Sequence, residues 1–487
     1  MVMILPKKPS DSSIPWFSIG ITAIVLLSLA LRFWGLGRFN RLVFDEVYYA
    51  IFANNYLTGT SFFNPHPPLS QYIIAIGIWI GSHLPFGQDT VNDLTGSLRS
   101  TWSYRWLNAL TGSLIPIVVA ALAYQLNRRR SYALIAALFS ATDGLFLVES
   151  RYALNNIYLV ILGLLGQLFF LLALNHHGAK RWLMLILSGV FFGASAAIKW
   201  NGLWFLLGIY ILWAVAWIWQ LFRTYFGQKT RIRPIPSGRH PLQNLTELNV
   251  GHILLNLVSL PALTYSLLWI PHLLMNPTPG FWESQVKILT FHQNVGSGTD
   301  VHPYCSRWYS WLLMWRPVAY FYQTASHSPE AVPTDSPLSA GTSSVIYDVH
   351  AIGNPFLWWL STTAILLLLL LLTQRMLEGV GWKSIPTSYS WITLYLIVNY
   401  AANLLPWTKV TRCTFLYHYM GASVFSGLAL AWLVDRWLHS EQNQYRSAAV
   451  TVILVVLLAF IFWLPIYLGL PLSESGYQLR MWFRSWI

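Results

Sequence analysis

The sequence predicts an all-α protein that crosses a membrane many times, with about 11 transmembrane helices. Of its 487 residues, 55% are hydrophobic and only 10% are charged, and the mean hydropathy is +0.49. Soluble domains carry about 25% charged residues. Several apolar runs reach the roughly 20 residues that a helix needs to cross a hydrocarbon core. The runs are continuous rather than alternating, which favours helices over barrel strands.

The expected spans follow one another along most of the chain. They cover residues 14–36, 104–126, 133–148, 153–174, 182–198, 203–222, 252–270, 355–373, 388–405, 414–435 and 448–468. A shorter apolar piece at residues 71–84 is too short to span comfortably, and we expect it to form a helix that lies at the membrane interface.

Basic residues between the runs predict the orientation, because Lys and Arg collect in cytoplasmic loops. Lys7 and Lys8 precede the first run, Arg128-Arg129-Arg130 follows the second, and a basic loop follows residue 222. The first run has no small-residue cleavage site, so we interpret it as a retained anchor with a cytoplasmic N-terminus. This orientation places residues 37–103 and 271–354 on the external side.

The two external loops divide the chain into three predicted parts. Residues 1–270 form an N-terminal transmembrane catalytic region that includes the external loop 37–103. Residues 271–354 form a long external loop, and residues 355–487 form a C-terminal transmembrane region. The Ser/Thr/Pro-rich stretch Thr324–Ser344 within the long loop is expected to be flexible. No internal repeat is evident, which weakens the interpretation as a secondary transporter.

The net charge of +13 does not indicate nucleic-acid binding here. Much of it follows from membrane topology, and no compact basic module with interleaved aromatic residues is present. We therefore expect no nucleic-acid partner. The two cysteines, Cys305 and Cys413, have no CxxC or zinc-site spacing. They can form a disulfide if both face an oxidising compartment.

An acidic pair, Asp45–Glu46, directly follows the first span. Phe44 and Tyr48 flank it, so the pair lies in an apolar, interfacial run. A lone acid at such a place is commonly a solvated loop residue, but ionisable groups at membrane depth are costly and tend to be functional. About twenty residues on, His66-Pro67-Pro68 stiffens the chain, and Pro starts helices well. We expect a braced loop with one short helix on either side of His66.

Cations also gather at the predicted outer ends of the spans, where orientation alone does not account for them. They are Arg99, Arg105, Arg151, Arg307, Arg316, Lys409 and Arg412. Their number suggests that an anionic group is held on the external side. The alternative is that they pair with external acids and lipid headgroups.

Several of these residues belong to motifs that recur in a fixed order. The motifs are Phe44-Asp45-Glu46-Val47, His66-Pro67-Pro68-Leu69, Arg105 in RWLNALTG, Ser150-Arg151-Tyr152, Lys199-Trp200-Asn201-Gly202, His302-Pro303-Tyr304 with Ser306, Trp308, Trp311 and Arg316-Pro317, and Phe415-Leu416-Tyr417-His418-Tyr419. Each motif is weak alone, but the ordered set resembles the dolichyl- or polyprenyl-phosphate-mannose protein O-mannosyltransferase family. These enzymes are membrane glycosyltransferases of the GT-C class.

The chain departs from the family pattern in two places. It has no segment long enough for the soluble β-trefoil insert of the fungal and animal enzymes, which fits the bacterial branch. After Ser-Arg-Tyr the family often has an Asp, whereas this chain reads Ala153-Leu154-Asn155-Asn156. The neutral Asn residues put an electrostatic role for that acid in doubt.

The resemblance implies a GT-C fold and an inverting glycosyl transfer at the extracytoplasmic face of a cell membrane. Mannose would pass from a polyprenyl-phosphate lipid to Ser or Thr hydroxyls of secreted or membrane proteins. A hydroxyl is a poor nucleophile, and a carboxylate within hydrogen-bond reach can take its proton during the attack. Asp45 matches the family's catalytic acid and is expected to be the base. Glu46 is expected to orient the acceptor or to substitute in part.

The departing lipid phosphate gains charge, so fixed cations would stabilise it. Arg105 is the first choice for this role, because its guanidinium offers a planar, bidentate fork. Arg151, Lys199 and Arg412 are further candidates, although long cations at membrane edges also snorkel without any other role.

Four more side chains are expected to position substrate. His66 can bind the sugar or brace its loop. His302 and Trp308 can shape a substrate groove or belong to the core of the long loop, and His418 lies near another outer membrane edge. Asp45, Glu46 and His66 could together form a divalent-metal site. The resemblance does not require a metal, however, and we expect neither a metal nor a cofactor.

Two other functions remain as alternatives. A related GT-C enzyme, similar to aminoarabinose transferases, would move a lipid-linked sugar to a lipid or a glycan. A lipid-sugar transporter would place charged residues in the middle of the membrane, whereas the candidate residues here cluster at the outer ends of the spans. The sequence does not indicate the oligomeric state.

Overall fold

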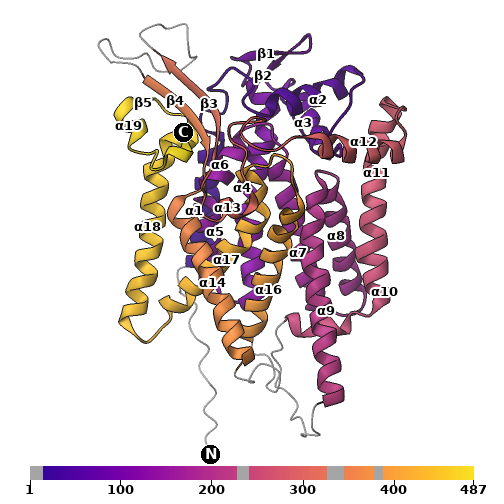
Figure 1. Ribbon diagram of the computed structural model, residues 1–487, viewed down its shortest axis with the longest axis vertical. Coiled ribbons are helices and arrows are strands. Elements are labelled where there is room, and N and C mark those ends of the chain that lie inside the picture. Colours follow the sequence, from indigo (N-terminus) through magenta and orange to yellow (C-terminus); the bar gives the residue numbers. More distant parts are fainter. Residues whose placement is uncertain (1–14, 227–240, 326–344, 378–387) are drawn as a thin grey trace, which may run out of the picture.

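The computed structural model describes residues 15–226, 241–325, 345–377 and 388–487. Long helices run side by side along the long axis of the molecule (Figure 1). They are α1 (Trp16–Phe33), α4 (Thr101–Asn127), α5 (Arg130–Ala141), α7 (Asn156–Leu174), α8 (Gly178–Ala196), α9 (Leu203–Phe226), α10 (Val250–Ile253) with α11 (Leu260–Met275), α14 (Pro355–Leu377), α16 (Ser388–Leu404), α17 (Met420–Leu438) and α18 (Asn443–Leu468). The short helix α6 (Gly144–Arg151) follows α5 at an angle.

The helices confirm a protein that spans the membrane several times. Within the described ranges, seven helices are long and apolar enough to cross a membrane, and α5 with α6 makes an eighth if the pair is one bent span. The three remaining predicted spans correspond to α8, α16 and α17, which do not meet the same length and hydropathy criteria. The number eleven therefore stays a prediction, as does the division into three parts.

The run 133–148, expected as one straight span, is broken between α5 and α6. The two helices meet at 58°. Asp143 caps the start of α6, since its side chain accepts hydrogen bonds from the backbone N–H groups of Leu145 and Phe146. At Gly144, any Cβ atom would lie 2.1 Å from the ring of Tyr467, so only glycine allows this close approach. The break lets α6 carry its last residues toward the external end of the bundle.

The first external loop folds into two helices and a hairpin. α2 (Glu46–Thr58) and α3 (Leu69–Gly81) lie on either side of His66, which confirms the expected arrangement. α3 is also the short apolar helix expected near residues 71–84. The strands β1 (Val91–Leu94) and β2 (Ser97–Ser100) pair antiparallel, and α4 begins directly afterwards, with Ser100 as its N-cap. Figure 1 shows these elements together at the upper end of the bundle.

The second external loop is more ordered than expected. It contains α12 (Phe281–Asn294), α13 (Trp308–Trp311), β3 (Val318–Ala325) and β4 (Val345–Ala351). β4 lies between β3 and the C-terminal β5 (Leu472–Ser473), and both neighbours pair with it antiparallel. The chain is mostly helical, as predicted, and these short strands belong to its external loops and its C-terminal segment. Of the stretch expected to be flexible, only Thr324 and Ala325, at the end of β3, fall within the described residues.

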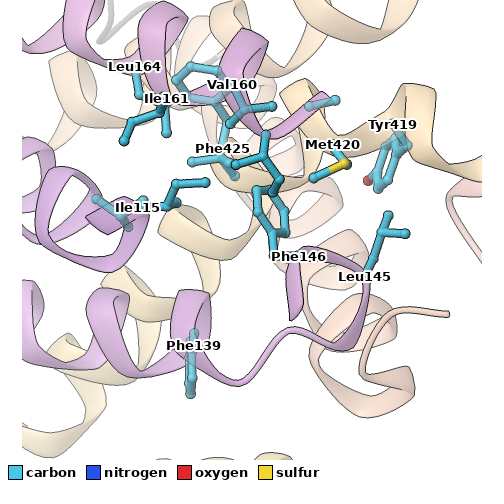
Figure 2. Close-up of a cluster of buried hydrophobic side chains, with 14 of the residues drawn as sticks. Ile115, Phe139, Leu145, Phe146, Val160, Ile161, Leu164, Tyr419, Met420 and Phe425 are labelled. Atoms are coloured by element: carbon cyan, nitrogen blue, oxygen red, sulfur yellow. The ribbon is translucent and has the colours of Figure 1, made fainter. Parts of the chain in front are cut away.

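The core lies where helices from both halves of the chain meet. Figure 2 shows apolar side chains packed together: Ile115 of α4, Phe139 of α5, Leu145 and Phe146 of α6, Val160, Ile161 and Leu164 of α7, Met420 and Phe425 of α17, and Tyr419 just before α17. All of them are buried. Lipid tails are as apolar as these side chains, so close packing rather than exclusion of water holds membrane helices together.

Candidate active site

The two acids at the start of α2 have different surroundings. The Glu46 carboxylate is fully buried and receives two hydrogen bonds from Arg105, Nε to Oε1 at 2.9 Å and Nη2 to Oε2 at 2.8 Å. It also accepts the backbone N–H groups of Val43 and Ala153, each at 2.8 Å. Glu46 thereby joins α4, the segment before α2 and the segment after α6. These contacts favour a structural role for Glu46 over the expected one of orienting the acceptor.

All the hydrogen-bond donors of the Arg105 side chain are also used within the protein. A guanidinium has five N–H donors. Two of them bind Glu46, and the other three donate to the backbone carbonyls of Leu36, Phe39 and Arg41 at 2.8–3.1 Å. Arg105 is fully buried. It has no N–H group left for a donor phosphate, so this geometry does not support the phosphate role expected for Arg105.

Arg151 also serves the fold rather than a ligand. Its Nη1 and Nη2 groups donate to the carbonyls of Leu31, Arg32, Trp34 and Gly35, at 2.7–3.2 Å. These carbonyls lie at and just beyond the end of α1, and helix C-termini attract cations because their last carbonyls lack partners. The Arg151 side chain is buried. The phosphate role expected for it is therefore not supported by this geometry.

Asp45, in contrast, is left with a free carboxylate. It occupies the N-cap position of α2, but its side chain makes no capping bond, and in the described part of the chain it accepts no other side-chain or backbone hydrogen bond. The residue is half-buried. Burial raises the pKa of Asp45 to about 6, although the positive charge of Lys199 opposes this shift.

The backbone before Asp45 is strained. Phe44 has φ of 52°, a left-handed conformation that is uncommon for residues other than glycine. Its ring stacks on Tyr320 of β3 with centroids 4.2 Å apart, nearly parallel. The Val43 N–H bond to Glu46 closes the same turn. Such strain persists where the surroundings enforce it, which is common at functional sites.

Two of the expected cations belong to the same electrostatic cluster: Lys199 acts directly on Asp45, and Arg412 interacts with Lys199 and His66. Lys199 lies between α8 and η1 (Trp200–Gly202), and its Nζ donates to Asn156 Oδ1 at 3.0 Å and lies 5.4 Å from the centre of the Tyr417 ring. Burial lowers the pKa of Lys199 to about 8, while the negative charges of Asp45 and Glu149 raise it.

Arg412 is the second cation. Its Nη1 donates to the neighbouring Cys413 carbonyl at 2.9 Å, and no other hydrogen bond from its side chain to the described residues is present. Cys413 forms a disulfide with Cys305, so the pairing considered from the sequence is made. The N–H of Cys413 also donates to the Gly296 carbonyl at 2.7 Å. These bonds tie the cation-bearing segment to the long external loop.

Histidines complete the cluster, including one that the sequence analysis did not single out. The rings of His66 and His292 lie 5.0 Å apart. His292 comes from α12, and its Nε2 donates to the Pro65 carbonyl at 3.0 Å, while its buried Nδ1 has no partner among the described residues. Burial, reinforced by Lys199 and Arg412, holds the pKa of His66 well below its usual value and lowers that of His292 to about 4. Both rings are therefore neutral. Only the FHQN sequence at the end of α12 could have pointed to His292.

The other predicted positioning residues lie around this cluster. His418 is buried, its Nδ1 accepts the Phe415 N–H at 3.0 Å, and its ring centre lies 4.5 Å from that of Trp407. His302 packs edge-on against Phe415, with ring centres 5.0 Å apart. Trp308 is half-buried at the start of α13 and packs on the core. Both His302 and Trp308 pack against neighbouring rings or the core, and within the described chain neither forms a hydrogen bond with Asp45.

A divalent-metal site is not formed by the residues considered for it. Among the residues that the structure describes, no group of three or more His, Cys, Asp and Glu side chains is arranged to hold a metal ion. Glu46 is committed to Arg105. The available groups are instead one free carboxylate, two cations and neutral imidazoles, a set that can deprotonate a hydroxyl and bind a phosphate.

Two family models match the chain. The one described as dolichyl-phosphate-mannose-protein mannosyltransferase matches residues 22–274, and the one described as the C-terminal four TMM region of protein-O-mannosyltransferase matches residues 277–486. Two relatives are named polyprenol-phosphate-mannose–protein mannosyltransferase. The one from Corynebacterium glutamicum is 25% identical, over 95% of this chain and 92% of its own length. The one from Mycobacterium tuberculosis is 23% identical, over 100% and 94%.

A solved structure has the same fold. The protein O-mannosyltransferase Pmt1-Pmt2 complex of S. cerevisiae, bound to the sugar donor, contains a chain that superposes with a TM-score of 0.76. The alignment covers 98% of this chain and 93% of the yeast chain, with 14% sequence identity. At this identity the likeness establishes the fold, and the GT-C expectation is confirmed.

Proposed function

The chain belongs to the dolichyl-phosphate-mannose-protein mannosyltransferase family, and we propose that it transfers mannose from a polyprenyl-phosphate donor to Ser or Thr hydroxyls of secreted or membrane proteins. The names of its full-length relatives support this donor and a protein acceptor. They favour a protein over the lipid or glycan acceptor of an aminoarabinose-transferase-like enzyme.

The free carboxylate of Asp45 beside the fully bound Glu46 is the observation that carries the mechanism. As the acceptor oxygen attacks the anomeric carbon, its proton passes to an Asp45 oxygen. The bond between the anomeric carbon and the phosphate oxygen breaks on the opposite face, and the electron pair leaves with the lipid phosphate. A single displacement inverts the anomeric centre, so no second carboxylate is required as a nucleophile.

Lys199 and Arg412 are the cations proposed for the leaving phosphate. Both interact electrostatically with the groups around Asp45 and His66. Neither is paired with a carboxylate in the salt bridges of the described residues. Preorganised cations at a point of developing charge lower the barrier without reorganising during the reaction. His66, His292 and His418 supply neutral hydrogen-bonding groups for the sugar.

We propose that the site faces the extracytoplasmic side of the cell membrane. The disulfide between Cys305 and Cys413 lies at the site end, and disulfides persist in oxidising compartments. The cluster Arg128-Arg129-Arg130 lies at the opposite end, between α4 and α5, as positively charged cytoplasmic loops do. These two observations independently support a cytoplasmic N-terminus.

The nature of the product tests the proposed function. Purified protein in liposomes would receive radiolabelled polyprenyl-phosphate-mannose, a Ser/Thr-rich peptide and a matched peptide with Ala in place of every Ser and Thr. We expect label on the first peptide only. Label that appears only in the lipid fraction, or equally on both peptides, would overturn the assignment.

A further inference from the structure

Glu149, at the end of α6, is a buried acid that the proposed mechanism does not use. We infer that Glu149 is a positioning residue, which keeps Lys199 charged and in place beside Asp45. The inference rests on the proposed function, because it assigns Glu149 a part in the binding of the donor phosphate by Lys199.

Glu149 is connected to both sides of the site. Its Oε1 accepts the hydroxyl of Tyr320, whose ring stacks on Phe44, the residue before Asp45. Its Oε2 accepts Nδ2 of Asn156 at 3.1 Å. The Asn156 Oδ1 in turn accepts Lys199 Nζ at 3.0 Å. One amide therefore bridges the carboxylate and the ammonium group.

Lys199 needs a counter-charge at this place. It is 6% exposed, and the one hydrogen bond of its ammonium group to the described residues goes to a neutral amide. Burial and the positive charge of Arg412 both favour its neutral form, while Asp45 and Glu149 favour the ammonium form. When Asp45 accepts a proton during transfer, Glu149 is the negative charge that remains. A neutral amine would attract a phosphate far less.

Hydrogen bonding alone does not explain a carboxylate here. A glutamine could accept Asn156 Nδ2 through its amide oxygen and donate its Nε2 group to the Tyr320 hydroxyl oxygen, without the cost of a buried charge. Asn156 also belongs to the segment after Ser150-Arg151-Tyr152, where the resemblance led us to expect an acid. The carboxylate of Glu149 lies one hydrogen bond from Asn156, so the chain has an acid at this place although its sequence position differs.

Because Asn156 lies between Glu149 and Lys199, the carboxylate can be moved from position 149 to position 156 by a double substitution. An acid at position 156 would contact Lys199 directly, whereas an acid at position 155 would lie in the same buried segment without a bond to Lys199. The variants are Glu149→Gln, Glu149→Gln with Asn156→Asp, and, as the matched control, Glu149→Gln with Asn155→Asp. All would be compared with wild type in liposomes, at varied donor concentration.

We expect Glu149→Gln to lower kcat/KM by at least about tenfold, chiefly through a higher donor KM. Without the negative charge of Glu149, Lys199 is less readily protonated and attracts the donor phosphate less strongly. Asn156→Asp in the same chain should return kcat/KM to within about threefold of wild type, and Asn155→Asp should not. Wild-type kcat/KM in Glu149→Gln, or no recovery in a folded Glu149→Gln/Asn156→Asp chain, would overturn the inference.

Thermal unfolding of the same chains separates this inference from the proposed function. Loss of transfer by wild type would count against the function alone. The unfolding temperature should fall in Glu149→Gln, since a buried cation loses its counter-charge, and recover in Glu149→Gln/Asn156→Asp. Equal unfolding temperatures in wild type, Glu149→Gln and Glu149→Gln/Asn156→Asp would contradict the pairing of Glu149 with Lys199, whatever the reaction.

Discussion

Both oxygens of the Glu46 carboxylate are bound by one guanidinium, that of Arg105, in a place where neither side chain is exposed to solvent. The two residues are 59 positions apart in sequence. Their pairing leaves Asp45 as the acid without a partner at the start of α2. The contact of Glu46 with Arg105 of α4 therefore decides which of the two adjacent acids is free to act as a base.

Breaking this pair should damage stability before it affects chemistry. Removal of one partner of a buried ion pair costs about 3–5 kcal/mol, because the other charge stays buried without compensation. We expect Glu46→Gln and Arg105→Gln each to lower the unfolding temperature strongly, and the double variant to be less unstable than the sum of the two. A thermal-unfolding double-mutant cycle measures this coupling. An additive cycle would contradict the buried pair.

Activity should depend on pH in a bell shape. Asp45 must be deprotonated to act as base, and its pKa is raised to about 6, so kcat/KM should rise as the pH increases through about 6. Lys199 must be protonated, and its pKa is lowered to about 8, so kcat/KM should fall above about 8. Since the two groups interact, the apparent pKa values of the two limbs of the pH profile belong to the cluster rather than to either residue alone.

Lys199→Arg provides the control for the alkaline limb. Arginine stays protonated throughout this range, so the fall above about 8 should disappear while the acidic limb remains. An unchanged alkaline limb in this variant would assign that limb to another group.

Arg412 should matter for the donor. We expect Arg412→Gln to lower kcat/KM by about 10²-fold, in the range measured for loss of a single charge-stabilising donor. Arg412→Lys should retain part of the activity, because it keeps the charge but loses the planar fork. Arg307→Gln is the matched control, since Arg307 is an exposed cation of the long external loop. Equal effects of the Arg412 and Arg307 variants would argue for a general surface-charge effect.

The disulfide should support the site as well as the fold. Its cysteines are 108 residues apart, and removal of a native disulfide typically costs about 2–5 kcal/mol in small secreted domains. We expect the Cys305→Ser/Cys413→Ser double variant to unfold at a lower temperature and to bind donor more weakly, because Arg412 adjoins Cys413. Reductant should lower the unfolding temperature of wild type only. A wild-type protein insensitive to reductant would indicate free thiols.

The broad architecture could be predicted from the sequence for a simple physical reason. A lipid environment permits only helices or closed barrels to span it, so long apolar runs translate directly into helices. The two short helices around His66 were also predictable, because Pro67-Pro68 marks the start of the second. The short strands were not, since β1 to β5 comprise between 2 and 8 residues each. In addition, β4 pairs with β5 from the far C-terminal part of the chain, where Val345 lies opposite Ser473.

The sequence could identify most of the residues near the site, but not the role of each one. Motifs drew attention to Asp45, Lys199 and Arg412, which the fold brings into one electrostatic cluster. The same reasoning placed Arg105 and Arg151 beside the donor, whereas their N–H groups are used by backbone carbonyls and Glu46. Whether a cation near a membrane edge is free or bound depends on tertiary partners, which local sequence does not reveal. His292 and Glu149 were missed because no local pattern distinguishes them.

A comparison of two adjacent carboxamide variants tests the assignment of Asp45 most directly. Asp45→Asn and wild type would be assayed for transfer of labelled mannose to a Ser/Thr peptide, alongside donor binding by the same liposomes. Removal of a general base costs about 10²–10⁴-fold. The account predicts a loss of this size with donor binding unchanged, and a Glu46→Gln variant that loses stability as well as activity. Wild-type transfer by Asp45→Asn would contradict the central claim that Asp45 is the base.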